Sequence, residues 1–198
     1  MNPQFWWYVA RATGVMAWVG AVGAVLIGLA LASRIGGRQV PPAWLLALHR
    51  HVGALTVALV GAHLGALVAD TYVHFGLADL LVPFAAGWGT GAVAWGVVAM
   101  WLLLVIEATS LAKRRLRART WRAIHLSSYA SALAATAHMV TAGTDASNPL
   151  LRWGPIAAVA VAACFLTYRA LMPRHASRRP AASAAATAPS AASAPSIR

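Results

Sequence analysis

The chain has 198 residues, of which 60% are hydrophobic and only 10% are charged. A soluble domain carries about 25% charged residues, so this chain cannot cover its surface with charge and we expect lipid to be its solvent. The net charge of +12 at pH 7 does not indicate nucleic-acid binding, because the basic residues lie mostly between apolar runs and near the C-terminal end, where they encode membrane topology.

Apolar runs of about 20 residues predict an all-α integral membrane protein, a bundle of about five transmembrane helices. The predicted spans are residues 7–31, 43–69, 89–112, 121–142 and 152–171. The glycines of the first span indicate close helix packing; they are Gly14, Gly20, Gly23 and Gly28. We expect residues 1–172 to form one transmembrane domain and residues 173–198, which are rich in Ala, Ser, Pro and Arg, to form a disordered tail.

The distribution of charge predicts the orientation of the bundle. Five spans place the two ends of the chain on opposite sides of the membrane. Of the 16 Lys and Arg residues, all except Arg11 and Arg152 lie on the side of the loops at 34–38 and 113–122 and of the tail. The positive-inside rule places that side in the cytoplasm. We therefore predict that the N-terminus lies outside and the C-terminus in the cytoplasm.

Histidines recur in the second and fourth spans. His49 and His63 are 14 residues apart, and His125 and His138 are 13 residues apart. Both spans run from inside to outside, so His49 and His125 lie near the inner face, and His63 and His138 lie at matching depths toward the outer face. Ionisable groups in membrane helices are candidate functional groups, and two facing imidazoles at each depth suit two stacked haems. Zinc fits less well, because it takes three or four ligands at one point.

Helical rotation separates His49 from its neighbour His51. At about 100° per residue, 14 residues end about 40° short of whole turns, so His49 and His63 share a face, whereas His51 is about 120° away from His63. His125 and His138 are about 140° out of alignment on a regular helix. A distortion of the helix or the reach of the side chains must make up that difference.

Arginines near the interfaces are candidates to bind haem propionates, because a guanidinium group suits a carboxylate geometrically. Arg50 and Arg122 would serve the inner haem and Arg11 the outer one. Topology signalling and snorkelling are the alternatives for these arginines. Glu107 could pair with an arginine near the inner face.

These residues resemble the ferric reductase-like transmembrane domain family. That family takes in ferric reductases, NADPH oxidases and the haem-binding membrane subunit of the bacterial methionine sulfoxide reductase system. The matching features, within about residues 6–172, are His49-Arg50 with His63, Thr109-Ser110 before the basic loop, Trp121-Arg122 with His125 and His138, and Ala142-Gly143-Thr144-Asp145. The resemblance implies two b-type haems, bound by His49 with His125 and by His63 with His138. It also implies electron transfer across the cytoplasmic (inner) membrane of a bacterium.

The chain departs from the family in two respects. Many relatives have six spans rather than five, and the oxidases and ferric reductases carry fused flavin and nicotinamide domains. Here no glycine-rich dinucleotide fingerprint follows the last span. We therefore expect an electron-transfer subunit of an oxidoreductase, which receives electrons from a separate cytoplasmic flavoprotein or from quinol and passes them to an acceptor outside.

Two other classes of function stay open from the sequence. A transporter could use the histidines to carry protons or metal ions, although Glu107 is the only carboxylate within a predicted span. A membrane anchor without a cofactor could hold a partner protein through its loops.

Overall fold

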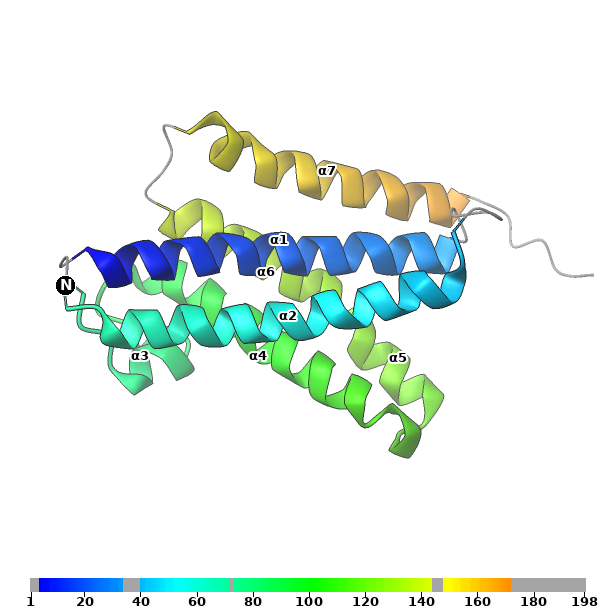
Figure 1. Ribbon diagram of the computed structural model, residues 1–198, viewed down its shortest axis with the longest axis horizontal. Coiled ribbons are helices and arrows are strands. Elements are labelled where there is room, and N and C mark those ends of the chain that lie inside the picture. Colours follow the sequence, from blue (N-terminus) through cyan, green and yellow to red (C-terminus); the bar gives the residue numbers. More distant parts are fainter. Residues whose placement is uncertain (1–3, 34–39, 72, 144–147, 172–198) are drawn as a thin grey trace, which may run out of the picture.

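The computed structural model describes residues 4–33, 40–71, 73–143 and 148–171, and the regular elements within these ranges are helices (Figure 1). The elements are α1 (Phe5–Ser33), α2 (Pro42–Ala69), α3 (Leu77–Leu81), α4 (Thr90–Leu111), the 3-10 turn η1 (Lys113–Arg115), α5 (Ala118–Leu126), α6 (Ser128–Ala142) and α7 (Pro149–Leu171). The predicted tail, the loop at 34–38, and Thr144 and Asp145 lie outside the described residues.

Four helices are long and apolar enough to cross a membrane: α1, α2, α4 and the segment Leu151–Tyr168 of α7. They coincide with four of the five predicted spans. Pro42 occupies the start of α2, where a helix tolerates proline because the first N–H groups have no partner within the helix. The all-helical fold and its membrane-spanning helices are thus confirmed, while the number of five spans and their orientation stay predictions.

The predicted fourth span is not a single helix. Residues 121–142 fall in α5 and α6, which are divided at Ser127. Ser127 has φ −65° and ψ −7°, and its hydroxyl donates to the carbonyl of Ile124 at 2.6 Å. Serine pairs such as Ser127-Ser128 are a known cause of helix kinks, because their hydroxyls compete for backbone carbonyls. The break lies between His125 and His138. Their spacing of 13 residues would leave the two side chains on different faces of a regular helix, so a distorted helix is one of the two solutions that the sequence predicts.

Two antiparallel pairs of helices form the frame of the bundle. In the α1–α2 pair the helices pack along each other, and in the α4–α6 pair α5 extends α6 against α4 (Figure 1). The two pairs meet mainly through α1 and α6, and α7 packs against both of these helices. Large apolar side chains on the spans are exposed, among them Leu55, Trp95 and Leu133. Such a surface suits contact with lipid chains rather than water.

The connector between α2 and α4 folds over the end of the bundle at which α2 ends and α4 begins. Asp79 accepts a hydrogen bond from the amide of Gly76 at 2.8 Å, which fixes the first turn of α3. The indole of Trp101 donates to the carbonyl of Leu81 at 2.8 Å and ties the connector to α4. Phe75 packs on a small buried cluster that includes Val93. The connector therefore closes one end of the space between the two helix pairs.

Candidate functional site

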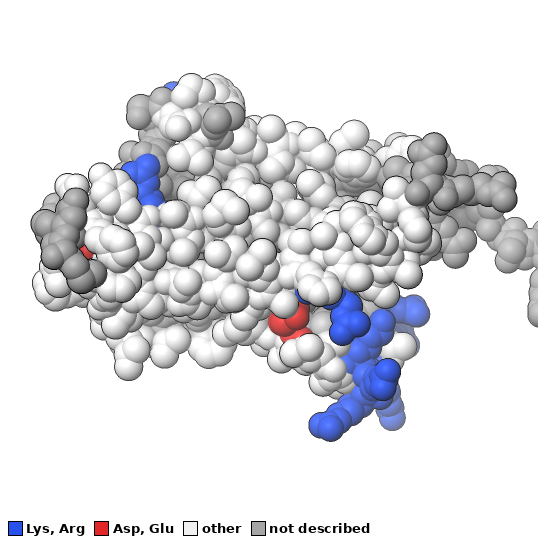
Figure 2. Space-filling view, viewed as in Figure 1, with Lys and Arg blue, Asp and Glu red and all other residues white. Residues whose placement is uncertain are grey.

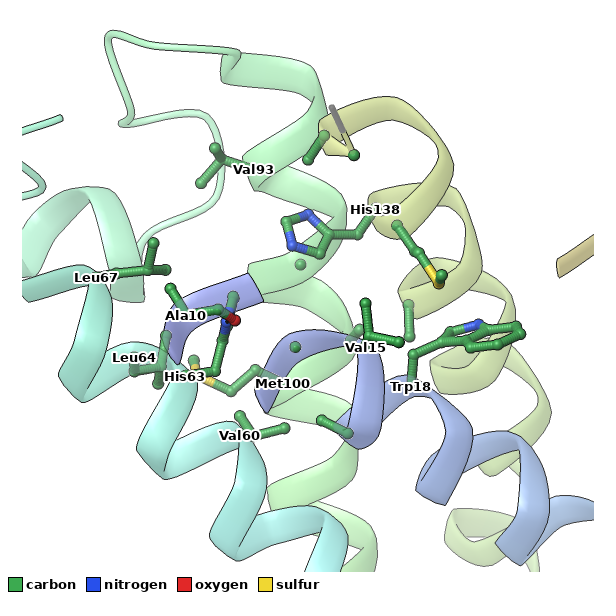
Figure 3. A pocket seen from close by; sticks show the side chains of 18 of the residues that line it. Ala10, Val15, Trp18, Val60, His63, Leu64, Leu67, Val93, Met100 and His138 are labelled. Atoms are coloured by element: carbon green, nitrogen blue, oxygen red, sulfur yellow. The ribbon is translucent and has the colours of Figure 1, made fainter. Parts of the chain in front are cut away.

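The outer histidines face each other across the two helix pairs. His63 is on α2 and His138 is on α6, with their ring centres 6.4 Å apart and their ring planes at 74°. Figure 3 shows the two rings reaching into the same space from different helices. The structure thus brings together two residues that the sequence placed at equal depth.

The inner histidines form a second pair of similar geometry. His49 on α2 and His125 on α5 have ring centres 5.9 Å apart and ring planes at 71°. His51 does not take part, because its side chain is exposed and its Nδ1 lies 2.7 Å from the carbonyl of Ala47 on its own helix. This arrangement agrees with the sequence analysis, which places His49, and not His51, on the helix face that carries His63.

The Nδ1 atom of each paired histidine faces the other helix of its own pair. Three of the contacts are made to carbonyl oxygens: His63 to Ala10 at 2.7 Å, His49 to Ala24 at 3.0 Å and His138 to Ala92 at 2.7 Å. A carbonyl oxygen only accepts hydrogen bonds, so we assign the proton to Nδ1 in these three rings. The neutral imidazole then keeps a lone pair on Nε2, the form that binds a metal.

His125 is held differently from the other three histidines. Its Nδ1 lies 3.5 Å from the hydroxyl of Ser110 on α4, a long contact. Its ring stacks on the indole of Trp121, with centres 4.9 Å apart and planes at 23°. The ammonium of Lys113 lies 3.9 Å from the centre of the Trp121 ring, and the Trp121 Nε1 atom is buried without a hydrogen-bond partner. This column of three side chains connects the basic loop to the inner pair.

The spacing of the rings fits a metal bound between two imidazoles. A metal–nitrogen bond of about 2 Å on each side, with about 1 Å more from each nitrogen to its ring centre, separates the ring centres by about 6 Å. The observed separations are 5.9 and 6.4 Å. A hydrogen bond from the second ring nitrogen to a carbonyl is the usual support of a metal-binding histidine. Two ligands on opposite sides are what a haem iron takes, since the porphyrin occupies its other positions.

A cavity of about 760 Å³ surrounds the outer pair. Its walls come from α1, α2, α4 and α6, and they are mostly apolar, with Val60, Leu64 and Met100 among them (Figure 3). Cofactor pockets are usually apolar clefts of about 300–1,000 Å³. His63 and His138 line this cavity and the inner histidines do not. The cavity therefore lies at the outer histidine pair and not at the inner one.

Charged side chains also line this cavity. They are Arg11, Asp70 and Arg152. The sequence predicts a propionate role for Arg11, whereas it places Arg152 only at the start of the fifth predicted span and Asp70 directly after the second. Each arginine lies against a tryptophan, Arg11 at 4.5 Å from the ring centre of Trp7 and Arg152 at 5.5 Å from that of Trp153. Arg11 and Arg152 are predicted near the same membrane surface, and this common position is the sequence signal that could have assigned both to one site. Two guanidinium groups at one cavity suit the two carboxylates of a haem.

The inner candidates Arg50 and Arg122 are both exposed. Glu107 reaches across from α4 to α2, where a methyl group placed on Gly53 would lie 3.4 Å from its Oε2. Arg50 precedes Gly53 by about one helical turn. The roles of these three charged residues at the inner pair stay predictions.

Comparison with known protein families, curated proteins and solved structures found no match to the chain. The ferric reductase-like resemblance therefore rests on the residues quoted above, and the function is argued from the geometry of the histidines.

Proposed function

We propose that the chain is a diheme b-type cytochrome subunit of the ferric reductase-like kind, which transfers electrons across a membrane. One observation carries this proposal: the ring centres of the two histidine pairs lie 5.9 and 6.4 Å apart, close to the separation that a metal between two imidazoles would require. In three of the four rings Nδ1 is engaged by a carbonyl of the neighbouring helix. The inner haem is bound by His49 and His125, and the outer haem by His63 and His138.

The residues of the chain determine which chemistry these sites support. A bound haem supplies one-electron chemistry through its ferric and ferrous iron. His49 with His125, and His63 with His138, would hold the two haems by two imidazoles each, which would favour electron transfer over the binding of a small molecule at the iron. The carbonyls that accept from Nδ1 fix the ring orientations and increase the basicity of the ligands. The mostly apolar walls around His63 and His138 would give the outer haem a surrounding of low polarity.

The two sites lie far enough apart to carry electrons most of the way across a bilayer. Fourteen residues of α2 between His49 and His63 correspond to about 21 Å at about 1.5 Å per residue. The hydrocarbon core is about 30 Å thick. The proposal places five spans in a bacterial cytoplasmic membrane, with the N-terminus outside, and the distribution of Lys and Arg supports this orientation.

A basic surface marks the end of the molecule at which electrons enter. Figure 2 shows the largest group of Lys and Arg side chains projecting at the lower right, where Figure 1 draws α5 and the end of α4. The exposed basic residues of this region are Lys113, Arg114, Arg115, Arg117, Arg119 and Arg122. Basic surfaces attract acidic partners in a salt-dependent way, and the column from Lys113 to His125 leads directly to the inner pair. A separate cytoplasmic flavoprotein is therefore the proposed donor, with quinol as the other possible donor and an acceptor outside.

A visible spectrum of the purified full-length protein tests this proposal. After haem-replete expression the protein should be red and should show a b-type band on reduction. A colourless protein would contradict the proposal and would leave the transporter and the cofactor-free anchor as the alternatives.

A further inference from the structure

Three of the four paired histidines contact the same short sequence pattern, an alanine and a glycine four residues apart, on a neighbouring helix. In each case Nδ1 bonds to the carbonyl of an alanine, and a glycine follows that alanine four residues later. The three alanine–glycine segments with their histidines are Ala10–Gly14 with His63, Ala24–Gly28 with His49, and Ala92–Gly96 with His138.

Helix geometry explains why the glycine stands at that position. In an α-helix the carbonyl of one residue accepts from the amide four residues later, so the side chain of that later residue stands beside the carbonyl. A methyl group on Gly96 would lie 2.8 Å from Nδ1 of His138, and one on Gly14 would lie 3.0 Å from Nδ1 of His63. A methyl group on Gly28 would lie 3.4 Å from Cε1 of His49. At Gly96 and Gly14 the absence of a side chain is what lets the ring reach the carbonyl, whereas at Gly28 a methyl group would only touch the ring.

We infer that Gly14, Gly28 and Gly96 are positioning residues for the haem ligands. Each glycine opens a notch over a helix carbonyl, and the imidazole in that notch is held in one tautomer and one orientation. The inference rests on the proposed function, because the value of the notch lies in presenting Nε2 to an iron. His125 has no such notch and contacts the Ser110 hydroxyl instead, so the inner site is held more loosely on that side.

Other glycines on the same helices separate this role from general helix packing. Small residues often line helix contacts in membranes. However, a methyl group on Gly23 of α1 or on Gly91 of α4 would meet nothing within 4 Å. These two positions therefore supply matched controls, with the same substitution on the same helices.

The contact distances also predict a graded effect of alanine at the three notches. A ring bonded to a carbonyl cannot retreat without losing that bond. At Gly96 the methyl group would approach closest, so the ring must move; at Gly14 the contact is slightly longer, and at Gly28 it is an ordinary contact. The disturbance should decrease in the order Gly96→Ala, Gly14→Ala, Gly28→Ala.

The experiment compares Gly96→Ala and Gly14→Ala with Gly91→Ala and Gly23→Ala in the full-length haem-loaded protein. Haem content, the low-spin signature of each haem and the two midpoint potentials are measured. Gly96→Ala should lose the low-spin signature of the outer haem, with total content falling toward one haem per chain. Gly14→Ala should show the same change more weakly, and both controls should keep two low-spin haems. The inner haem serves as the folding control, because its ligands are untouched.

Three results would overturn the inference. In the first, Gly96→Ala keeps both low-spin haems at unchanged potentials. In the second, Gly91→Ala disturbs the outer haem as much as Gly96→Ala does. In the third, Gly96→Ala loses both haems, which indicates a general packing defect. Each of these results leaves the proposed function standing if the wild-type protein is red, whereas a colourless wild type overturns both.

Discussion

His63 and His138 come from different helix pairs, yet their ring centres lie 6.4 Å apart and each ring is bonded through Nδ1 to a carbonyl of the neighbouring helix in its own pair. Each histidine is thus held by a contact within its own helix pair, independently of the other pair. The contact between the two pairs places the two rings side by side, with a cavity around them.

The outer pair predicts the effect of removing either ligand. His63→Ala or His138→Ala should abolish the outer haem and keep the inner one, because a haem with one axial histidine removed is bound weakly. Haem content per chain, measured after extraction, should fall by about half. His51→Ala is the matched control, since its exposed ring bonds within its own helix. Full haem content with unchanged spectra in both variants would show that the outer pair is assigned wrongly.

The Ser110 contact predicts a change confined to the inner haem. Ser110→Ala removes the hydroxyl near Nδ1 of His125, which lowers the basicity of that ligand and disfavours the ferric state. Because the contact is long, the inner midpoint potential should rise by less than about 40 mV, the shift that corresponds to about 1 kcal/mol for one electron. Thr109→Ala is the control, because the Thr109 hydroxyl bonds to carbonyls of its own helix. Equal shifts in both variants would remove Ser110 from this role.

Much of this site was predictable from the sequence, because depth follows from position along a span. His49 and His63 lie on one face of α2. The angle of about 100° per residue already places His51 on a different face. On a regular helix His125 and His138 would point about 140° apart. The sequence did not show how the chain brings both side chains to the same face. The answer is the break at Ser127, a backbone change whose only signal was the serine pair Ser127-Ser128.

Other parts of the site could not be predicted, since they depend on how the helices pair. The glycines of the first span indicated close packing, but only the antiparallel register of α1 on α2 places Gly14 under His63 and Gly28 under His49. Arg152 was recognised only as a charge on the outer side. It joins Arg11 at the cavity because α7 packs beside α1.

The arginines at the cavity predict the direction of a redox shift. Arg11→Gln or Arg152→Gln removes a positive charge near the outer haem, which makes the ferric state relatively more stable. The outer midpoint potential should fall, by about 40 mV if each charge contributes about 1 kcal/mol. The inner potential should not change in either variant. Arg117→Gln in the basic loop is the control, and an outer potential that is unchanged by both cavity variants would exclude the propionate role.

The basic loop predicts a salt-dependent reduction of the inner haem. A reduced flavin reductase with an acidic surface should reduce the purified protein faster at low salt than at high salt. Changing Arg114, Arg115 and Arg117 together to Gln should slow the reaction at low salt and leave the high-salt rate similar. Stopped-flow absorbance measures both rates. Rates that are indifferent to salt and to these changes, with rapid reduction by quinol, would exclude the cytoplasmic flavoprotein as donor.

The electron paramagnetic resonance spectrum of the oxidised wild-type protein tests the two bis-histidine sites most directly. When two axial imidazole planes on a ferric haem are nearly perpendicular, the low-spin signal has one very large g value, whereas parallel planes give a rhombic signal. The ring planes here meet at 71° and 74°. We therefore predict two strongly anisotropic low-spin signals, one of which disappears in His63→Ala and the other in His49→Ala. A haem-replete preparation with no low-spin ferric signal would contradict both histidine pairs as haem ligands.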